Sequence, residues 1–385
     1  MVQQARDLIP RLAERAERAE ELRALAPETE QDLHQTGLYR MLQPERVGGS
    51  ELDYGILVDV GAELARGCAS TAWNLTNLAS HHWMLAMFSQ AAQSRVWDED
   101  RDALIASSFI FPVGKARIVK GGYRLSGRWP FSSGVGVCGW NMLGGIVADS
   151  AAAATPGHCI FLLPRSDYNI IDTWHAVGLK GTGSHDVACE DVFVPEEMTI
   201  PVANLMGGAA PGSAINPNPL YKLPVFALFP LILSGIALGN LDACLDTYIA
   251  TTRDSTSRYS GARLAELQST QIKIGAAGTR ADVARRIMLA VCAEAMDDAR
   301  AGRVPDIETK MAYRRDVAFT TGLCTEAIDL LYTASGARAL FTRNALQRQF
   351  RDAHAIANHI AFNMDIATAA HGRVALGLEC DNPIV

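Results

Sequence analysis

The side chains best suited to acid–base chemistry lie near the C-terminus, in residues 351–363. His359 follows Asp352 by seven residues and precedes Asn363 by four. The segment has no Gly or Pro and predicts a helix, on which these intervals place all three side chains on one face. Because an imidazole exchanges its proton near neutral pH, His359 is a candidate general acid or base, and a satisfied core histidine is the alternative. His354 lies on another face without chelating spacing, so we expect it to be structural and predict no metal.

A second candidate group lies in residues 68–88, a long apolar segment without helix breakers. This pattern predicts a helix that is buried on most sides. Trp73 and His81 are eight residues apart and therefore lie on nearly the same side of it. Core packing is the alternative for Trp73, and we expect His82 to be structural.

Two groups of hydroxyl and glycine residues could contact a polar ligand. Ser132 and Ser133 end a predicted strand in "WPFSSG", where a hydroxyl can both donate and accept a hydrogen bond. The alternative is an ordinary Ser-Ser-Gly turn. The glycine-rich "GLKGTGS", residues 178–184, could hold a phosphate through its backbone N–H groups, with Lys180 and Ser184 as candidate contacts.

Three segments must position these side chains. Residues 1–102 have helical patterns, and residues 103–211 contain short alternating runs separated by Gly and Pro, which are typical of a β-domain. "IVKGGYRLSG", residues 118–127, predicts a hairpin with Gly-Gly at its turn. Residues 212–385 return to a 3.6-residue period and predict a helix bundle. Its most apolar run, residues 223–239, is close to membrane-spanning length, but we expect a buried bundle helix.

Composition excludes several classes of protein. The chain has 385 residues, of which 49% are hydrophobic and 20% charged, as in a globular protein of more than one unit. Its formal net charge is −7 without a basic stripe, so nucleic acid and anionic membranes are poor partners. The eight cysteines are scattered and form no C-x-x-C pair, which favours reduced thiols in the cytoplasm over zinc or disulfides.

The order helices, β-domain, helix bundle resembles the acyl-CoA dehydrogenase fold. That fold is α+β: an N-terminal helical domain, a central β-barrel-like domain and a C-terminal four-helix bundle. The resemblance is carried by four segments: "GLYRMLQPERVGGSELD" (37–53), "GLKGTGSHDVACEDVFVPEE" (178–197), "SRYSGARLAELQSTQIKIGAA" (257–277) and "RQFRDAH" (348–354). Dehydrogenases of this family use a Glu base shortly after the Arg-Asp, and that position here is Ile360. An isoleucine cannot transfer a proton, and no Glu occurs between Glu197 and Glu266, where other members carry their base.

His359 resembles instead a histidine of the flavin-dependent two-component monooxygenases, which share this fold. That group includes the oxygenase components for 4-hydroxyphenylacetate, for a steroid-derived phenol and for dibenzothiophene. The resemblance implies reduced flavin (FMNH2 or FADH2) supplied by a separate NAD(P)H-dependent reductase, and O2 as co-substrate. It implies a C4a-hydroperoxyflavin that oxygenates a small aromatic or heteroaromatic substrate, in a cytoplasmic homotetramer. The alternative is a dehydrogenase with a displaced base.

The resemblance also suggests roles for individual residues. A hydroxyl of Ser132 or Ser133 is expected at flavin N5, Trp73 beside the flavin ring, and Arg258 at a flavin phosphate across a subunit interface. The complete set of expected flavin contacts is Trp73, Ser107, Ser132, Ser133, Lys180, Ser184 and Arg258. The expected substrate contacts are His81, Ser108 and Asn363, and the expected catalytic residues are His359, His81, Ser132 and Ser133.

Overall fold

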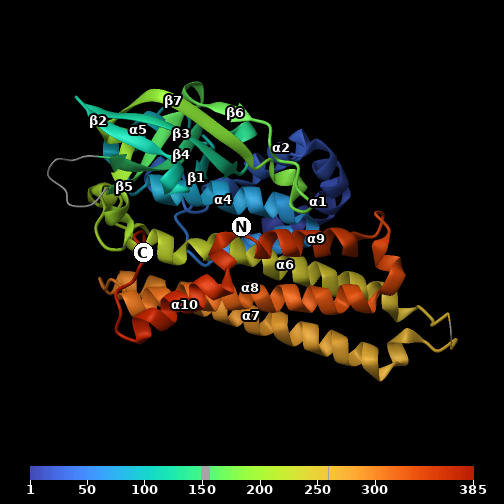
Figure 1. The fold of residues 1–385 in the computed structure, drawn as a ribbon. Helices are drawn as coiled ribbons and strands as arrows, with labels where there is room; N and C mark the ends of the chain where they lie inside the picture. The colour runs from blue at the N-terminus through green and yellow to red at the C-terminus, as the bar shows by residue number, and fades with distance from the viewer. Residues whose placement is uncertain (149–156, 259) are drawn as a thin grey trace.

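The computed structural model describes residues 1–148, 157–258 and 260–385. Helices form the N-terminal part, which Figure 1 draws in blue: α1 (Val2–Leu22), α2 (Pro27–Thr36), α3 (Ile56–Gly67), α4 (Ala69–Leu85) and α5 (Gln90–Trp97). The ends of α2 follow its sequence signals. Pro27 stands in its first turn, and Gly37 ends it with a φ of 69°, which favours glycine.

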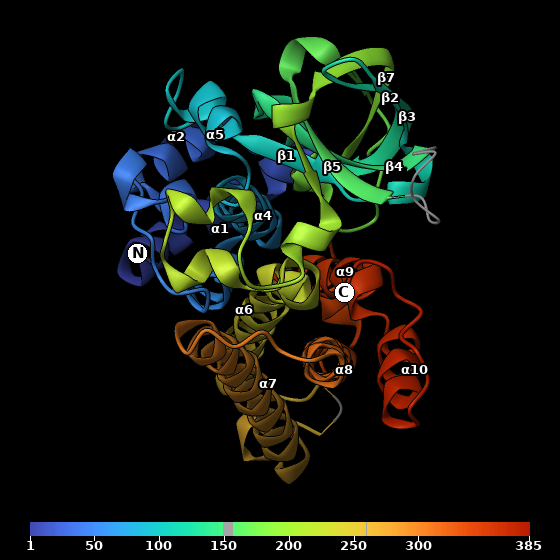
Figure 2. The same ribbon diagram turned by 90° about the vertical axis from the view of Figure 1, so that its left-hand side faces the viewer.

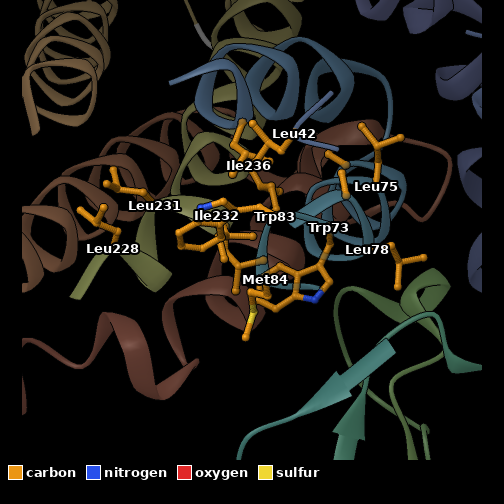
Figure 3. Close-up of a cluster of buried hydrophobic side chains, with 14 of the residues drawn as sticks. Leu42, Trp73, Leu75, Leu78, Trp83, Met84, Leu228, Leu231, Ile232 and Ile236 are labelled. Atoms are coloured by element: carbon orange, nitrogen blue, oxygen red, sulfur yellow. The ribbon is translucent and has the colours of Figure 1, made fainter. Parts of the chain in front are cut away.

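Helix α4 is the centre of the hydrophobic core. All 17 of its residues are buried, as its lack of charged side chains and breakers predicts. It packs against α3 and α6, and Figure 3 shows its Trp83 and Met84 among leucines and isoleucines of α6 (Val225–Arg253). Because α4 is enclosed on every side, its polar residues are held at fixed positions inside the protein.

The central part is one mixed sheet that curls on itself in the view of Figure 2. Its order is β6-β7-β3-β2-β4-β5-β8, and β1 pairs in parallel with β4. The strands are β1 (Ile105–Ser108), β2 (Lys115–Val119), β3 (Gly122–Ser132), β4 (Trp140–Ala148), β5 (Gly157–Pro164), β6 (Asn169–Ile171), β7 (His185–Pro195) and β8 (Thr199–Pro201). The α+β fold predicted from the sequence is therefore confirmed.

The predicted hairpin of residues 118–127 forms between β2 and β3, with one difference at its turn. Val119 pairs with Gly122, so the turn is Lys120 and Gly121. Gly121 has a φ of +81°, which suits glycine. Gly122 belongs to the strand, where a Cβ would lie 2.2 Å from the Val194 carbonyl oxygen.

The C-terminal part is a bundle of α6, α7 (Gln268–Arg300), α8 (Ile307–Ala334), α9 (Ala345–Ala357) and α10 (Met364–Ala375). Helix α6 is long and apolar enough to cross a membrane, but 89% of its most apolar window is buried inside this chain. It is thus the buried bundle helix that the sequence predicted. For the same reason, residues 223–239 do not require a neighbouring subunit to cover them.

The single helix predicted for residues 351–363 is also wrong. Helix α9 ends at Ala357, and His359 has an extended backbone with a φ of −66° and a ψ of 136°. Asn363 then caps α10 through its side chain, which accepts from the Ile366 N–H. His359, Asp352 and Asn363 therefore do not share a helix face. The side chains of His359 and Asn363 each cap the start of a new helical segment rather than continue one helix, a role that local hydrogen bonding favours.

Candidate active site

A buried hydrogen-bond network joins α4 to the end of β3 and to the glycine-rich loop. Trp73 Nε1 donates to Ser133 Oγ at 3.0 Å, and Ser133 Oγ lies 2.7 Å from Ser184 Oγ. Ser184 Oγ lies 2.7 Å from Thr182 Oγ1, which donates to the Leu179 carbonyl at 2.9 Å. Each hydroxyl has one proton, and that of Thr182 is used on Leu179. Ser184 must therefore donate to Thr182, and Ser133 to Ser184.

An irregular turn brings both serines inward at the end of β3. Phe131 has a φ of +65° and is 62% exposed, and the pairing register shifts between Trp129 and Ser132. A left-handed phenylalanine is costly and is found where the surrounding structure enforces it. Ser132 is completely enclosed and accepts from Asn141 Nδ2 at 3.0 Å, whereas Ser133 keeps 6% exposure.

Arg351 and Asp352 of α9 hold the glycine-rich loop of residues 178–184 in place. The Leu179 N–H donates to Asp352 Oδ1 at 2.7 Å, and a Cβ on Gly178 would lie 2.2 Å from the Arg351 carbonyl oxygen. Burial raises the pKa of Asp352 to about 6. Lys180, in the following 3-10 turn, is partly exposed. Asp352 thus holds the loop that carries Ser184, at a place unrelated to His359.

A continuous series of aromatic rings connects His359 to His81. The imidazole of His359 is stacked with Phe229 at a centroid distance of 6.3 Å and lies edge-on to Trp73 at 5.6 Å. Phe229 meets Phe109 at 6.0 Å, and Phe109 meets His81 at 6.2 Å. These contacts bring together four distant parts of the chain: α4, the segment after β1, α6 and the end of α9.

The two histidines of this aromatic cluster have opposite hydrogen-bonding polarity. His81 Nδ1 lies 2.5 Å from the Ile105 carbonyl, which only accepts, so Nδ1 carries the proton and Nε2 is a bare acceptor. That buried Nε2 has no partner among the residues described. His359 Nδ1 accepts from the Ala361 N–H at 3.2 Å, so its neutral ring carries the proton on Nε2.

Both rings are neutral at pH 7. Burial lowers the pKa of His81 to about 4. Burial, together with the positive charge of Arg314, lowers the pKa of His359 to about 4. A neutral pair with one acceptor and one donor can hold a polar aromatic ligand without adding charge.

The remaining predicted site residues are placed differently. Ser107 is buried in β1, and its hydroxyl has no hydrogen-bond partner in the described part of the chain. Ser108 Oγ donates to the Pro130 carbonyl at 2.8 Å and so ties β1 to β3. Arg258 is exposed and belongs to the segment between α6 and α7; Figure 1 shows that segment at the end of the bundle remote from the sheet. Asn363 is exposed as a helix cap, apart from the network of Ser133. His354, expected to be structural, is partly exposed and contacts Asp329 at 2.9 Å.

Sequence reasoning missed the aromatic wall. Phe226 and Phe229 are three residues apart in α6 and lie against Phe109, with ring distances of 5.6 and 6.0 Å. The spacing of three is a detectable signal of a shared helix side, but their partner on another element is not visible in the sequence. Asn141, which holds Ser132, was missed because a single asparagine in a strand has no local signature.

Two cavities lie away from this cluster. One of about 500 Å³ is on the sheet between Ser166 and Phe193, and one of about 200 Å³ lies between α1, α6 and α9. We place the site at the aromatic cluster because its unpaired polar atoms and neutral histidines suit ligand chemistry. In the described residues, no group of three His, Cys, Asp or Glu side chains could hold a metal ion.

The fold and this arrangement match the acyl-CoA dehydrogenase class of flavoproteins. Residues 1–98 match the family model for the acyl-CoA dehydrogenase N-terminal domain, and residues 231–364 match that for its C-terminal domain. Ile360, at the position of the dehydrogenase base, is 65% exposed and cannot titrate. Relatives that match this chain over nearly its full length identify the particular family within this class.

The chain belongs to the oxygenase subunits of flavin-dependent monooxygenases. It is 35% identical over 382 residues to the flavin-dependent monooxygenase oxygenase subunit HsaA of Rhodococcus jostii, covering 98% of both chains. It is 33% identical to the oxygenase component of an FADH(2)-dependent resorcinol hydroxylase of Rhizobium sp., covering 94% of this chain and 91% of that one. The crystal structure of 3-HSA hydroxylase from Rhodococcus sp. superposes with a TM-score of 0.92 at 34% identity, covering 100% and 98% of the two chains.

This membership makes the chain an oxidoreductase that uses reduced flavin and O2, and an oxygenase component implies a separate flavin reductase. A solved relative, XiaF from Streptomyces sp., is a complex with FADH2 and glycerol; it has a TM-score of 0.91 at 26% identity and covers 100% and 96% of the two chains. The residues here fit such a heterocycle. Asn74 Oδ1 is a buried acceptor without a partner in the part of the chain that is described, and it lies close to Gly134. The N–H groups of a flavin are the kind of donor that such acceptors lack.

Proposed function

We propose that this monooxygenase hydroxylates a phenol, or an aromatic ring with one comparable hydrogen-bond donor. The proposal is carried by the unpaired, buried Nε2 of His81. An unsatisfied buried acceptor costs about 1 to 3 kcal/mol, which a substrate hydroxyl would recover by donating to it. The aromatic rings that connect His81 to His359 are suited to a flat ring by edge-to-face and offset contacts.

In this proposal the two histidines have separate tasks. His81 Nε2 accepts the hydrogen bond of the substrate hydroxyl and increases electron density on the ring. His359 stays neutral and donates a hydrogen bond from Nε2 to the oxygen that is transferred, while its Nδ1 keeps the Ala361 N–H. Bound reduced flavin supplies the two electrons that activate O2. The walls formed by Phe109 and Phe229 exclude water from this region.

We also propose that Ser133 rather than Ser132 contacts flavin N5. Ser132 has no exposed surface, whereas Ser133 has some. Ser133 donates to Ser184 and accepts from Trp73, which leaves one lone pair on its oxygen. That lone pair can accept from the N5–H of a reduced flavin.

The substrate proposal is tested with phenol and its methyl ether, anisole. Both are given with reduced flavin from a separate reductase, and product formed per O2 consumed is measured. We expect phenol to be hydroxylated and anisole to be bound weakly and to yield mainly peroxide, because an ether has no proton for His81. Indole, which has an N–H, is the second positive probe. Equal turnover of phenol and anisole would show that His81 does not select a donor.

We further propose a homotetramer in the cytoplasm. Several large apolar side chains of the C-terminal region are exposed in the single chain, among them Phe341, Ile366 and Leu376. Such side chains favour contact with another copy. The cysteines lie unpaired in the part of the chain that the structure describes, which suits a reducing compartment. Sedimentation that gives a stable monomer at micromolar concentration would rule out the tetramer.

A further inference from the structure

Helix α6 contains a proline near its start, and this leaves one backbone carbonyl without its normal partner. In an α-helix the carbonyl of Phe226 accepts from the N–H of residue 230, but Pro230 has none and its ring presses on that carbonyl. Arg314 of α8 supplies a donor instead, because its Nη1 lies 2.6 Å from the Phe226 carbonyl oxygen. The interrupted turn of α6 is thus held from outside by a neighbouring helix.

The surroundings of Arg314 single this residue out. It is partly buried and has no carboxylate within ion-pair distance in the described chain, and burial lowers its pKa. The adjacent Arg315 is different, since it pairs with Asp316 and contacts His371. Burying a cation that has only a carbonyl as its partner costs free energy. This cost suggests that the position of the Phe226 carbonyl is important for the protein.

The turn held by Arg314 carries the aromatic wall of the candidate site. Phe226 contacts Phe109 edge-on at a centroid distance of 5.6 Å, and Phe229 stacks with His359 at 6.3 Å. A rotation of this turn would move both rings relative to His359. Arg314 also places its positive charge close enough to His359 to influence it.

We propose that Arg314 is a positioning residue, which holds the Pro230-interrupted turn of α6 so that Phe226 and Phe229 form the substrate wall beside His359. The proposal rests on the proposed aromatic substrate for its effect on catalysis. Its structural content, that Arg314 replaces a missing helical N–H, does not depend on the substrate.

The first test replaces Arg314 by methionine, with Arg315→Met as the matched control. We expect Arg314→Met to raise the KM for phenol about tenfold and to increase peroxide release, while kcat changes less, since the charged hydrogen bond that holds the Phe226 carbonyl is lost. Arg314→Lys should restore part of the loss because it keeps a cationic donor. Arg315→Met should behave as the wild type. An unchanged KM in folded Arg314→Met protein would overturn the proposal.

The decisive test restores the missing N–H. Pro230→Ala supplies an amide that can donate to the Phe226 carbonyl, so Arg314→Met should have little effect in that background. Hydrogen exchange of a peptide covering residues 223–232 gives a readout that needs no substrate. We expect Arg314→Met to speed exchange there, Arg315→Met not to, and Pro230→Ala to suppress the increase. An equal effect of Arg314→Met in both backgrounds would overturn the inference. A wild type that neither binds nor hydroxylates phenol would instead refute the proposed function and leave the exchange result to decide the role of Arg314.

Discussion

Replacing His359 separates its local structural contribution from its proposed chemistry. Its Nδ1 caps the 3-10 turn Ile360–Phe362 by accepting from the Ala361 N–H at 3.2 Å, and its ring contacts Trp73 and Phe229 of the aromatic cluster, where Nε2–H is the proposed donor. Asparagine is a good helix cap and can provide the first interaction with Oδ1, but it lacks the second. Alanine provides neither. His359→Asn and His359→Ala therefore form a matched pair.

The magnitudes follow from these two interactions. We expect the free energy of unfolding of His359→Asn to stay within about 1 kcal/mol of the wild-type value. That of His359→Ala should fall by about 1 to 2 kcal/mol because the cap is lost. Both variants should lose roughly two to three decades of hydroxylation rate, the usual range when one hydrogen-bond donor to the reacting oxygen is removed. Binding of reduced flavin should stay near normal in both, because His359 meets Trp73 only at its ring edge.

The assay measures three quantities on one preparation: the melting temperature, the dissociation constant of reduced flavin under anaerobic conditions, and the single-turnover yield after mixing with O2 and phenol. The reasoning is refuted if His359→Asn retains wild-type yield per folded molecule. In that case the ring serves only to cap the turn and to pack against Phe229. Loss of flavin binding in both variants would show that His359 acts on the cofactor rather than on oxygen transfer.

Four further outcomes are expected. Ser133→Ala should raise peroxide release per product by roughly tenfold, because one hydrogen bond of about 1 to 3 kcal/mol is lost. Ser132→Ala is the matched control and should raise it much less. The same ratio of peroxide to product in both variants would exclude the N5 role of Ser133. Trp73→Phe keeps an aromatic side chain but removes the Nε1 donor to Ser133, and should weaken coupling without a large fall in melting temperature; an unchanged yield would contradict this. Stability should fall as pH decreases from 6.5 towards 4, because the unfolded chain then binds protons that the buried, neutral His81, His82 and His359 do not; the raised pKa of Asp352 offsets part of this. For His81 the loss amounts to roughly 3 kcal/mol, and acid titration of the wild type against His82→Gln measures the contribution of His82. Asp352→Ala should weaken flavin binding about tenfold because it frees the loop that contains Leu179. Asp352→Asn keeps an acceptor oxygen and should retain most of the flavin affinity. Equal flavin binding by the wild type and both variants would disprove this role of Asp352.

The sequence alone determined the order of the structural parts and the family. Alternation in residues 103–211 and the 3.6-residue period elsewhere depend on which side chains must be buried, and that pattern is local. The buried helix α4 and the α6 core helix followed from long runs without charge or breakers. The substitution of a titratable base by Ile360 beside His359 was also readable, because it concerns which residue types are present.

Tertiary structure decided which of these residues meet. The helix predicted through His359 ends at Ala357, since capping by polar side chains competed with propensity and prevailed. Asp352 was expected beside His359 but binds Leu179, 173 positions away in the chain. The protons of His81 and His359 are fixed by backbone groups of Ile105 and Ala361, whose positions depend on packing. Types and periods are properties of neighbouring residues in sequence, whereas hydrogen-bond partners and ring contacts between distant segments exist only once the helices and the sheet are packed together.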